Sequence, residues 1–318
     1  EAPPAIISMF LGDELGAIVD ALISGEEYHS AEAVAMDLGV AVLPKFLKDN
    51  TDRNRTSPFA FTGNKFEFRM PGSDVNLADC NMILNTAMAK GLKDFADAMG
   101  DVEGAEFEKK AIKYIKKTLT DHQRIIFNGN GYSQDWEEEA ERRGLANYRN
   151  TAEALPCFVS QKSLDLFAEF GILDEAEVRS RYEVKLEKYN KLLNIEARVM
   201  IRMARRAYLP AISDYMADLA SNITTVKAAL RGADMTEHEK LLNKILNGFN
   251  RAAECVRQLV KLHDATEAIE DPQEQANSYA EKVIPAMEAL RKEIDDLECI
   301  VERSYWPVPT YNDMLFYA

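Results

Sequence analysis

A five-residue stretch, 65–69, alternates strictly between charged and aromatic side chains, and it constrains the fold more than any other part of the sequence. Lys65, Glu67 and Arg69 fall on one side of it, and Phe66 and Phe68 fall on the other. Successive side chains of a β-strand point to opposite faces, so this alternation predicts a strand. We expect the two phenylalanines to anchor it in a core. The charged side chains would then stand in a row, about 6 to 7 Å from one to the next, given the rise of a strand.

This charged row suggests a chemistry. A carboxylate between two cations can hold a metal ion together with the phosphate groups that the metal bridges. The same pattern also occurs on solvated strands, where the charges form weak ion pairs. The row alone therefore leaves both interpretations open.

Composition and charge narrow the class of protein. The 318 residues, 47% hydrophobic and 29% charged, are typical of a folded protein with one large domain or two. The formal net charge of −15 argues against nucleic acid as a main partner, because a phosphate backbone requires a basic face. The sequence shows no apolar run long enough to span a membrane and no signal peptide. Its scattered cysteines, without a Cys-x-x-Cys pair, are typical of free thiols in a cytoplasmic protein.

The first part of the chain mixes helix and strand signals. Apolar periodicity predicts helices over 13–23, 79–99 and 106–119, and glycines follow the first two. The apolar run 124–127 predicts a short strand that enters a loop with two Asn-Gly pairs, 128–133. We interpret this loop as a structural turn more than as a nucleotide-binding loop, because it lacks the Lys-Ser/Thr ending of a P-loop.

From about residue 174 the pattern changes to long helices. Capping-box signatures, each with a glutamate three residues later, mark expected helix starts at Asp135, Asp174, Thr236 and Asp271. The last two helices carry apolar seams with a spacing of three and four, which predict antiparallel neighbours in a bundle. We interpret His263 on one seam as a packed residue and not a metal ligand. Pro210 lies within the expected helix 175–231, so a break is predicted there.

Several short motifs resemble those of the type III glutamine synthetases. They lie in a consistent order over nearly the whole chain, and this order makes the combination specific although each piece alone is weak. They are Glu1-Ala2-Pro3-Pro4-Ala5-Ile6-Ile7-Ser8, Asp52-Arg53-Asn54-Arg55-Thr56-Ser57-Pro58-Phe59, Lys65-Phe66-Glu67-Phe68-Arg69, Phe127-Asn128-Gly129-Asn130-Gly131-Tyr132-Ser133, and the ending Trp306-Pro307 with Pro309-Thr310-Tyr311. The chain resembles the C-terminal part of such an enzyme, and we interpret it as the back part of a longer protein.

The resemblance implies a fold and a reaction. Members of the family make glutamine from glutamate, ammonium and ATP through a γ-glutamyl phosphate, and they need Mg²⁺ or Mn²⁺. Their α+β catalytic domain wraps an antiparallel sheet into a half-barrel. The implied division is 1–173 for the C-terminal part of that domain, 174–304 for a bundle of long antiparallel helices, and 305–318 for an extended tail that packs back on the body. The implied partners are the upstream part of the same protein and further copies in a ring, a dodecamer by family resemblance.

The resemblance also assigns candidate site residues. Glu1 matches the flap glutamate, which closes over the substrate and takes a proton from ammonium. Arg55 matches an arginine that contacts the transferring phosphoryl group, and Arg69 matches one that steadies phosphate and substrate charge. Glu67 matches a carboxylate ligand of the divalent cation. Lys65 falls where many relatives carry a nucleotide-phosphate arginine, and lysine keeps the charge but loses the guanidinium fork.

Some of the family's site lies outside this chain. Ala60 falls where smaller relatives carry a further arginine, so that contact is absent or supplied elsewhere. The remaining metal ligands of the family sit upstream of Glu1, and we therefore expect the isolated chain to be inactive. Two rival interpretations stay open: a sister ligase that joins glutamate to another amine, and a non-catalytic fragment whose helices serve assembly or regulation.

Overall fold

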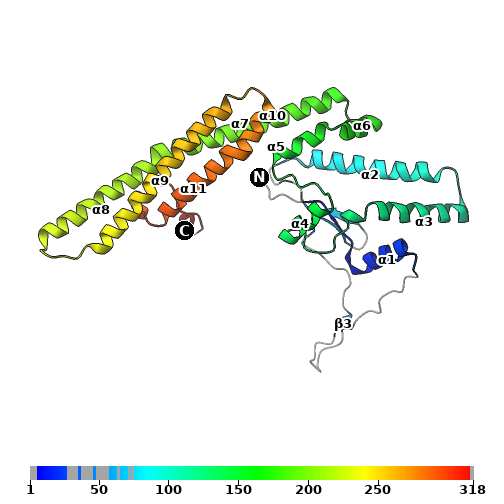
Figure 1. The fold of residues 1–318 in the computed structure, drawn as a ribbon, viewed down its shortest axis with the longest axis horizontal. Helices are drawn as coiled ribbons and strands as arrows, with labels where there is room; N and C mark the ends of the chain where they lie inside the picture. The colour runs from blue at the N-terminus through cyan, green and yellow to red at the C-terminus, as the bar shows by residue number, and fades with distance from the viewer. Residues whose placement is uncertain are drawn as a thin grey trace. The chain divides into compact units, whose positions relative to one another are not determined.

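The computed structural model describes residues 6–26, 35–36, 46–47, 57–62, 65–70, 72 and 75–315, with the backbone alone at 35–36, 46–47 and 311–312. Packing divides the chain into two compact units (Figure 1). Unit 1 comprises 1–154 and 160–175, and unit 2 comprises 155–159 and 176–318. The three-part division expected from the sequence stays a prediction.

Short strands form the sheets of unit 1. Strand β4 (Phe59–Phe61) lies in the middle of a three-stranded sheet, parallel to β1 (Met9–Phe10) and antiparallel to β5 (Phe66–Phe68). Strands β2 (Ala35–Met36) and β3 (Phe46–Leu47) form an antiparallel pair. The described three-stranded sheet is therefore mixed, whereas the sequence predicted an antiparallel one.

Helices make up most of the described part of unit 1. They are α1 (Gly12–Ser24), α2 (Leu77–Met99), α3 (Gly104–Asp121), η1 (Gln123–Ile125), α4 (Gln134–Arg142), α5 (Thr151–Ala154) and α6 (Gln161–Glu169). The first three confirm the predicted helices. Helix α1 ends at Gly25, whose φ of 84° is the left-handed conformation that glycine adopts most easily. The ring of Phe95 on α2 meets the ring edges of Phe107 and Tyr114 on α3, with centroids 6.3 and 5.5 Å apart.

Two predictions near α4 are wrong. Residues 123–125 form the 3₁₀ turn η1, and only Ile126 pairs with a strand, as a single bridge to Met9. The guanidinium of Arg143 donates hydrogen bonds to the carbonyls of Arg124 and Ile126 at 3.1 and 2.8 Å, so a side chain takes the place of a strand partner. Helix α4 begins two residues earlier than predicted, because its cap is Ser133, which accepts a hydrogen bond from the backbone of Trp136, and not Asp135.

Long helices form unit 2. They are η2 (Leu155–Val159), α7 (Glu175–Met203), η3 (Ala204–Tyr208), α8 (Leu209–Ala229), α9 (Thr236–Glu267), α10 (Pro272–Ser278), η4 (Tyr279–Val283), α11 (Ile284–Glu298), η5 (Arg303–Tyr305) and α12 (Tyr311–Leu315). Helix α9 packs against both α8 and α11 (Figure 1). The predicted seams of α9 and α11 lie in this core, where Ile245, Val256, Leu259, Leu290 and Leu297 are buried. The bundle expected from the 3–4 spacing is thereby confirmed.

A π-helical turn precedes a proline at two places in the bundle. Turn η3 ends two residues before Pro210, and η4 ends two residues before Pro285. Proline has no backbone N–H, and its ring clashes with the carbonyl four residues earlier. A wider turn relieves that clash without ending the helix. The break at Pro210 was predicted, and the equivalent one at Pro285 was missed.

The helix caps of unit 2 agree with the sequence in part. Asp271 caps α10 as predicted, accepting a hydrogen bond of 2.8 Å from the backbone of Glu274. Helix α7 starts directly after Asp174, also as predicted. The prediction for α9 is wrong, because Thr236 is its first helical residue, and its N–H donates to the side chain of Asp234 at 3.0 Å.

The C-terminal segment contacts the helices of unit 2. Trp306 is buried with its ring centroid 5.2 Å from that of Tyr208, and the rings of Tyr305 and Tyr215 lie 5.3 Å apart. The segment is not extended throughout, because it contains the short helix α12.

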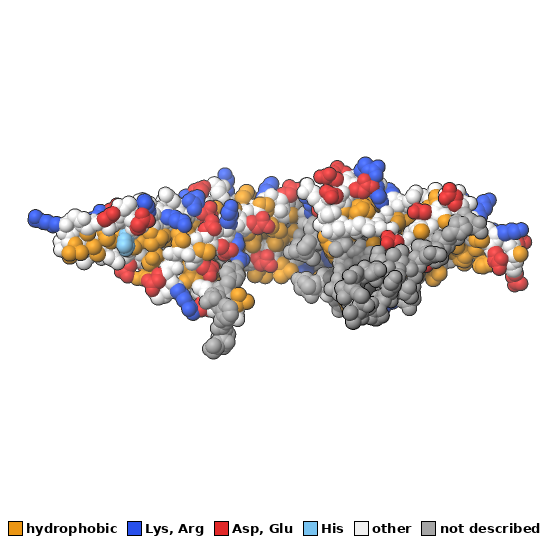
Figure 2. All heavy atoms as spheres, turned by 90° about the horizontal axis from the view of Figure 1, so that it is seen from below, with side chains coloured by type: hydrophobic (Ala, Val, Ile, Leu, Met, Phe, Trp, Pro, Cys, Tyr) orange, Lys and Arg blue, Asp and Glu red, His pale blue; other side chains and the backbone are white. Residues whose placement is uncertain are grey.

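Acidic and basic side chains are interspersed on the face drawn in Figure 2, with hydrophobic side chains between them. In the described part of the chain, no helix combines the length and the apolar character needed to cross a membrane.

Candidate functional site

The hairpin formed by β4 and β5 carries the predicted charged row. Its register places Phe59 opposite Phe68, Ala60 opposite Glu67, and Phe61 opposite Phe66. Directly opposite residues of an antiparallel pair share one face. Phenylalanines therefore occupy one face of the hairpin, while Ala60 and Glu67 occupy the other.

The phenylalanine face is only partly a core. The ring of Phe66 lies 5.6 Å from that of Phe59 and 5.2 Å from that of Phe61, measured between centroids, and Phe59 and Phe68 lie 6.3 Å apart. However, Phe66 remains 40% exposed and Phe68 is only half-buried, so neither phenylalanine of the strand is fully buried in a core as expected. The described sheet ends at β5, and an edge strand has fewer neighbours to cover its side chains.

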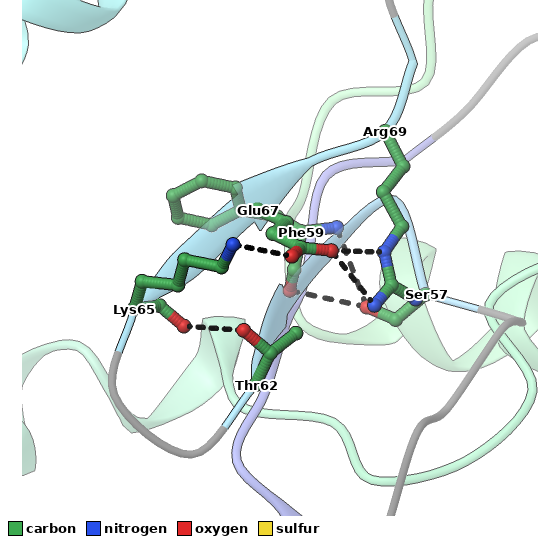
Figure 3. Close-up of polar contacts among 6 residues, drawn as sticks. All are labelled: Ser57, Phe59, Thr62, Lys65, Glu67 and Arg69. Carbon is green, nitrogen blue, oxygen red and sulfur yellow. Dashed lines mark hydrogen bonds and ion pairs between the residues drawn. The ribbon is translucent and has the colours of Figure 1, made fainter.

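On the opposite face, Glu67 lies between Lys65 and Arg69 (Figure 3). Its Oε1 is 3.2 Å from Lys65 Nζ, and its Oε2 is 3.3 Å from an Arg69 guanidinium nitrogen. Arg69 Nε also donates to the same Oε2 at 3.4 Å. The alternation in the sequence thus correctly predicted which three side chains come together.

These contacts keep the Glu67 carboxylate ionised. The hydrogen bond from Lys65 is the largest influence, and it lowers the pKa of Glu67 below its ordinary value. Partial burial acts in the opposite direction, and the hydrogen bond from Arg69 lowers the pKa further. The Glu67 side chain is 38% exposed and that of Arg69 is 25% exposed, so the row is still open to a ligand.

Backbone contacts hold the row in place. Arg69 N donates to the carbonyl of Pro58 at 2.8 Å, beside the end of the paired strands. At the other end, Thr62 N donates to the carbonyl of Lys65 at 2.8 Å and closes the hairpin. Ser57, which is 1% exposed, donates through Oγ to the carbonyl of Phe59 at 3.1 Å (Figure 3). A local backbone scaffold therefore positions both cationic side chains.

The loop 128–133 lies beside this hairpin. Tyr132 donates its hydroxyl to Met70 Sδ at 3.1 Å, and Met70 directly follows Arg69. Asn128 Oδ1 accepts hydrogen bonds from the N–H groups of Leu11 and Gly12, at 3.0 and 3.3 Å. The loop thus joins the start of α1 to the end of the charged row. This long-range role agrees with the interpretation of the loop as a structural turn.

A polar hollow of about 380 Å³ opens next to this loop in unit 1. Arg124, Arg142, Arg143, Asp20 and Asn128 are among its lining residues. Sequence reasoning missed this grouping and the contact of Tyr132. Asp20 comes from α1, whereas the other four residues come from the distant stretch 124–143, so no spacing rule could have found the grouping.

A divalent cation would find one ligand in the charged row. Glu67 offers a carboxylate, but no group of three potential ligand residues in the described part of the chain includes it. Mg²⁺ and Mn²⁺ prefer several oxygen ligands. The row therefore fits a cation only as one part of a larger ligand set.

One such group of three lies elsewhere in the described residues, formed by His263, Asp264 and Glu267 on α9. His263 is 3% exposed, with Nε2 3.1 Å from Asn194 Oδ1 and Nδ1 3.3 Å from Asp264 Oδ1. Its packed position agrees with the sequence interpretation.

Two of the site residues expected from the sequence, Glu1 and Arg55, lie outside the residues that the structure describes.

Known proteins resemble this chain along nearly its whole length. The family described as the glutamine synthetase C-terminal domain matches residues 110–227. The chain is 38% identical to the type-3 glutamine synthetase of Dictyostelium discoideum and 38% identical to a glutamine synthetase of Butyrivibrio fibrisolvens. It is 34% identical to a glutamine synthetase of Bacteroides fragilis (strain YCH46).

Each of these alignments covers 99% of this chain but only part of the relative. The covered share is 44% of the Dictyostelium protein and 45% of each bacterial protein. The chain thus spans less than half the length of the curated relatives that it matches.

Proposed function

Because the chain belongs to the type III glutamine synthetases, as its sequence motifs predicted, we propose that the protein containing it joins ammonia to glutamate. ATP drives the reaction through a γ-glutamyl phosphate. In this proposal, an upstream part of the protein completes the site, and the isolated chain is inactive. The structural observation that supports this proposal is the ionised Glu67 held between Lys65 and Arg69 on one face of β5.

The charged row suits phosphoryl transfer, which depends on positioning and on neutralising the charge of the transferring oxygens. Arg69 presents a guanidinium whose geometry matches phosphate oxygens, and Lys65 adds a mobile point charge. In the proposal Arg69 binds the phosphate and substrate charge, and Lys65 contacts the nucleotide phosphates. Arg55 contacts the transferring phosphoryl group, and Glu1 takes the proton from ammonium.

Glu67 is proposed as one ligand of Mg²⁺ or Mn²⁺, with its other ligands supplied from outside the described residues. A bound cation would neutralise phosphate charge at the site. Lys65 and Arg69 hold the Glu67 carboxylate ionised and oriented, which is the form that a hard cation requires. They would keep the ligand in place before the cation and nucleotide arrive.

The wider assembly belongs to the same proposal. The small described sheet would form part of the catalytic half-barrel, and 1–173, 174–304 and 305–318 would be the catalytic part, the type III bundle and the tail. Further copies would form a homo-oligomeric ring, a dodecamer by family resemblance. We also propose a cytoplasmic location, consistent with the free cysteines.

Phosphate release from ATP by the full-length protein tests the reaction. Glutamate and ammonium are added separately and together, with Mg²⁺ present. We expect release only with both, and a fall of at least 100-fold in Glu67→Gln, because the uncharged amide is a poor ligand for a hard cation. Glu187→Gln is the matched control, since Glu187 pairs with Lys191 at 2.8 Å on the surface of α7.

Each rival interpretation gives a different result. Release that requires glutamate and an amine other than ammonium would move the proposal to a sister ligase. No release from the full-length protein under any of these conditions would favour a non-catalytic role.

A further inference from the structure

Helix α7 carries an exposed apolar stripe, formed by Val184, Leu192, Ile195 and Val199 (α7 is labelled in Figure 1). These side chains are 62%, 46%, 59% and 36% exposed. Residues separated by three, four or seven to eight positions lie on the same face of a helix. The stripe therefore follows one side of the helix over about four turns.

The opposite side of α7 already faces the core of unit 2. Leu186, Leu193 and Ala197 are buried there. The stripe is thus a second apolar face, which the fold of unit 2 does not need. Exposed apolar faces with charged residues beside them are typical of sites of protein association.

A hollow of about 620 Å³ lies beside the C-terminal half of the stripe, between α7, η3, α11 and the C-terminal segment of unit 2. Ile195 and Val199 line it together with Met200, Met203 and Met287. Methionine side chains are flexible and adapt to the shape of an inserted apolar group. The hollow can therefore accept a side chain from a second helix laid along the stripe.

Two charged residues flank the middle of the stripe. Lys188 and Glu196 lie four residues before and four residues after Leu192, so each is about one turn from it on the same side. Both are exposed, and neither has an ion-pair partner among the residues that the structure describes. The stripe thus has a positive half and a negative half, arranged symmetrically about Leu192.

We propose that α7 pairs antiparallel with α7 of a second copy of this chain, around a two-fold axis at Leu192. This arrangement places Lys188 of each copy opposite Glu196 of the other. It also brings Val184 toward Met200 of the second copy, at the edge of the hollow. Each contact away from the axis occurs twice, and Leu192 meets its own copy on the axis.

The charges select this arrangement over the alternative. A parallel pair in the same register would place Lys188 against Lys188 and Glu196 against Glu196, and like charges across an interface are unfavourable. The antiparallel pair converts both repulsions into attractions. The proposal rests on the homo-oligomeric assembly under the proposed function and identifies one of its surfaces.

Disulfide crosslinking of the full-length protein tests whether the two-fold axis lies at Leu192. In Leu192→Cys the new thiols of two copies would face each other, so mild oxidation should convert most of the protein to a covalent dimer. Peptide mapping should find position 192 joined to position 192. The controls are the native protein, with its own four cysteines, and Leu246→Cys, which replaces a 44% exposed leucine on α9. Dimer formation no greater than in these controls, or a link from 192 to a different position, would overturn the proposal.

Charge reversal provides a second test in the Leu192→Cys background. Lys188→Glu should reduce the crosslinked fraction at least fivefold, and combining it with Glu196→Lys should restore the original fraction. A double variant that crosslinks no better than Lys188→Glu alone would contradict the antiparallel register. Glutamine formation is measured in parallel, so a failure of the surface and a failure of the proposed reaction can be told apart.

Discussion

Asn128 and Leu11, 117 residues apart in the sequence, are joined by a hydrogen bond of 3.0 Å from the N–H of Leu11 to Asn128 Oδ1. Helix α1 follows Leu11, whose own side chain offers no acceptor. Asn128 also accepts from Gly12 N at 3.3 Å. A distant side chain therefore satisfies two of the N–H groups that every helix start leaves without a partner in the helix itself. The cap fastens α1 to the loop beside the charged row.

Asn128→Ala should lower the free energy of unfolding by about 1 kcal/mol, the usual effect of removing a helix cap. Chemical denaturation of the two proteins, followed by circular dichroism, measures the difference. Asn243→Ala on the exposed surface of α9, where the amide donates to the carbonyl of Glu239 at 2.9 Å, is the control and should change it by less than half as much. Equal decreases in the free energy of unfolding for the two variants would show that the Asn128 cap stabilises the fold no more than an exposed side-chain hydrogen bond does.

Local signals in the sequence predicted the elements whose causes are local. The alternation at 65–69 predicted β5, and apolar periodicity predicted α1, α2 and α3. Pro210 predicted the break between α7 and α8, because the clash of a proline with its own helix does not depend on the rest of the fold. The same reasoning applied to Pro285 would have predicted the second π turn.

The predictions that failed depended on which side chain takes each backbone hydrogen bond. Residues 124–127 read as a strand, but the guanidinium of Arg143 binds the carbonyls there. The start of α9 read as a Thr236 cap, but Asp234 accepts its N–H instead. The site shows the same contrast, since the charged row follows from alternation, whereas the contact of Tyr132 with Met70 has no signal in the sequence.

Two helical glycines should respond oppositely to alanine. A Cβ on Gly248 in α9 would lie 2.8 Å from Leu297 Cδ2 on α11, which is too close for a real contact. A Cβ on Gly91 in α2 would meet nothing within 4 Å. We expect Gly248→Ala to destabilise the protein by about 1–3 kcal/mol, as overpacking does. Gly91→Ala should stabilise it by about 0.5–1 kcal/mol, because alanine favours the helix.

Thermal unfolding of the two variants measures this contrast. Each serves as the control for the other, because both changes add one methyl group to a helix. Stabilisation by Gly248→Ala would mean that Leu297 moves aside without cost, and that the packing of α9 on α11 is looser than the structure indicates.

The stability of α4 should depend on acidity through Glu139. The hydrogen bonds from Arg142 and then Arg143 lower the pKa of Glu139 from 4.5 to about 2 in the folded protein. The folded state therefore holds this proton less tightly than the unfolded chain does. Its contribution to stability is present above about pH 4.5 and is lost as the pH falls toward about 2.

The Glu139→Gln variant isolates this contribution. It should unfold at a lower temperature than the native protein at pH 6, and the difference should shrink steadily between pH 4.5 and the lowest pH at which folding persists. Glu138→Gln, on the exposed side of the same helix, is the control. A difference that is constant with pH would assign the effect to packing and not to the ionised carboxylate.

Arg69→Lys tests whether the site needs the shape of the guanidinium or only its charge. Arg69 meets Glu67 Oε2 through two nitrogens, at 3.3 and 3.4 Å, and lysine has a single nitrogen. If the proposed reaction holds, loss of one charged hydrogen bond, worth about 1.5–3 kcal/mol, should lower kcat/KM for phosphate release by the full-length protein about 10- to 100-fold. Arg257→Lys is the control, because Arg257 also uses two nitrogens to contact one oxygen of Glu254, on the surface of α9. Full activity in Arg69→Lys would mean that positive charge alone suffices at position 69. Position 65 of the same row already carries a lysine, which supplies charge without the guanidinium shape.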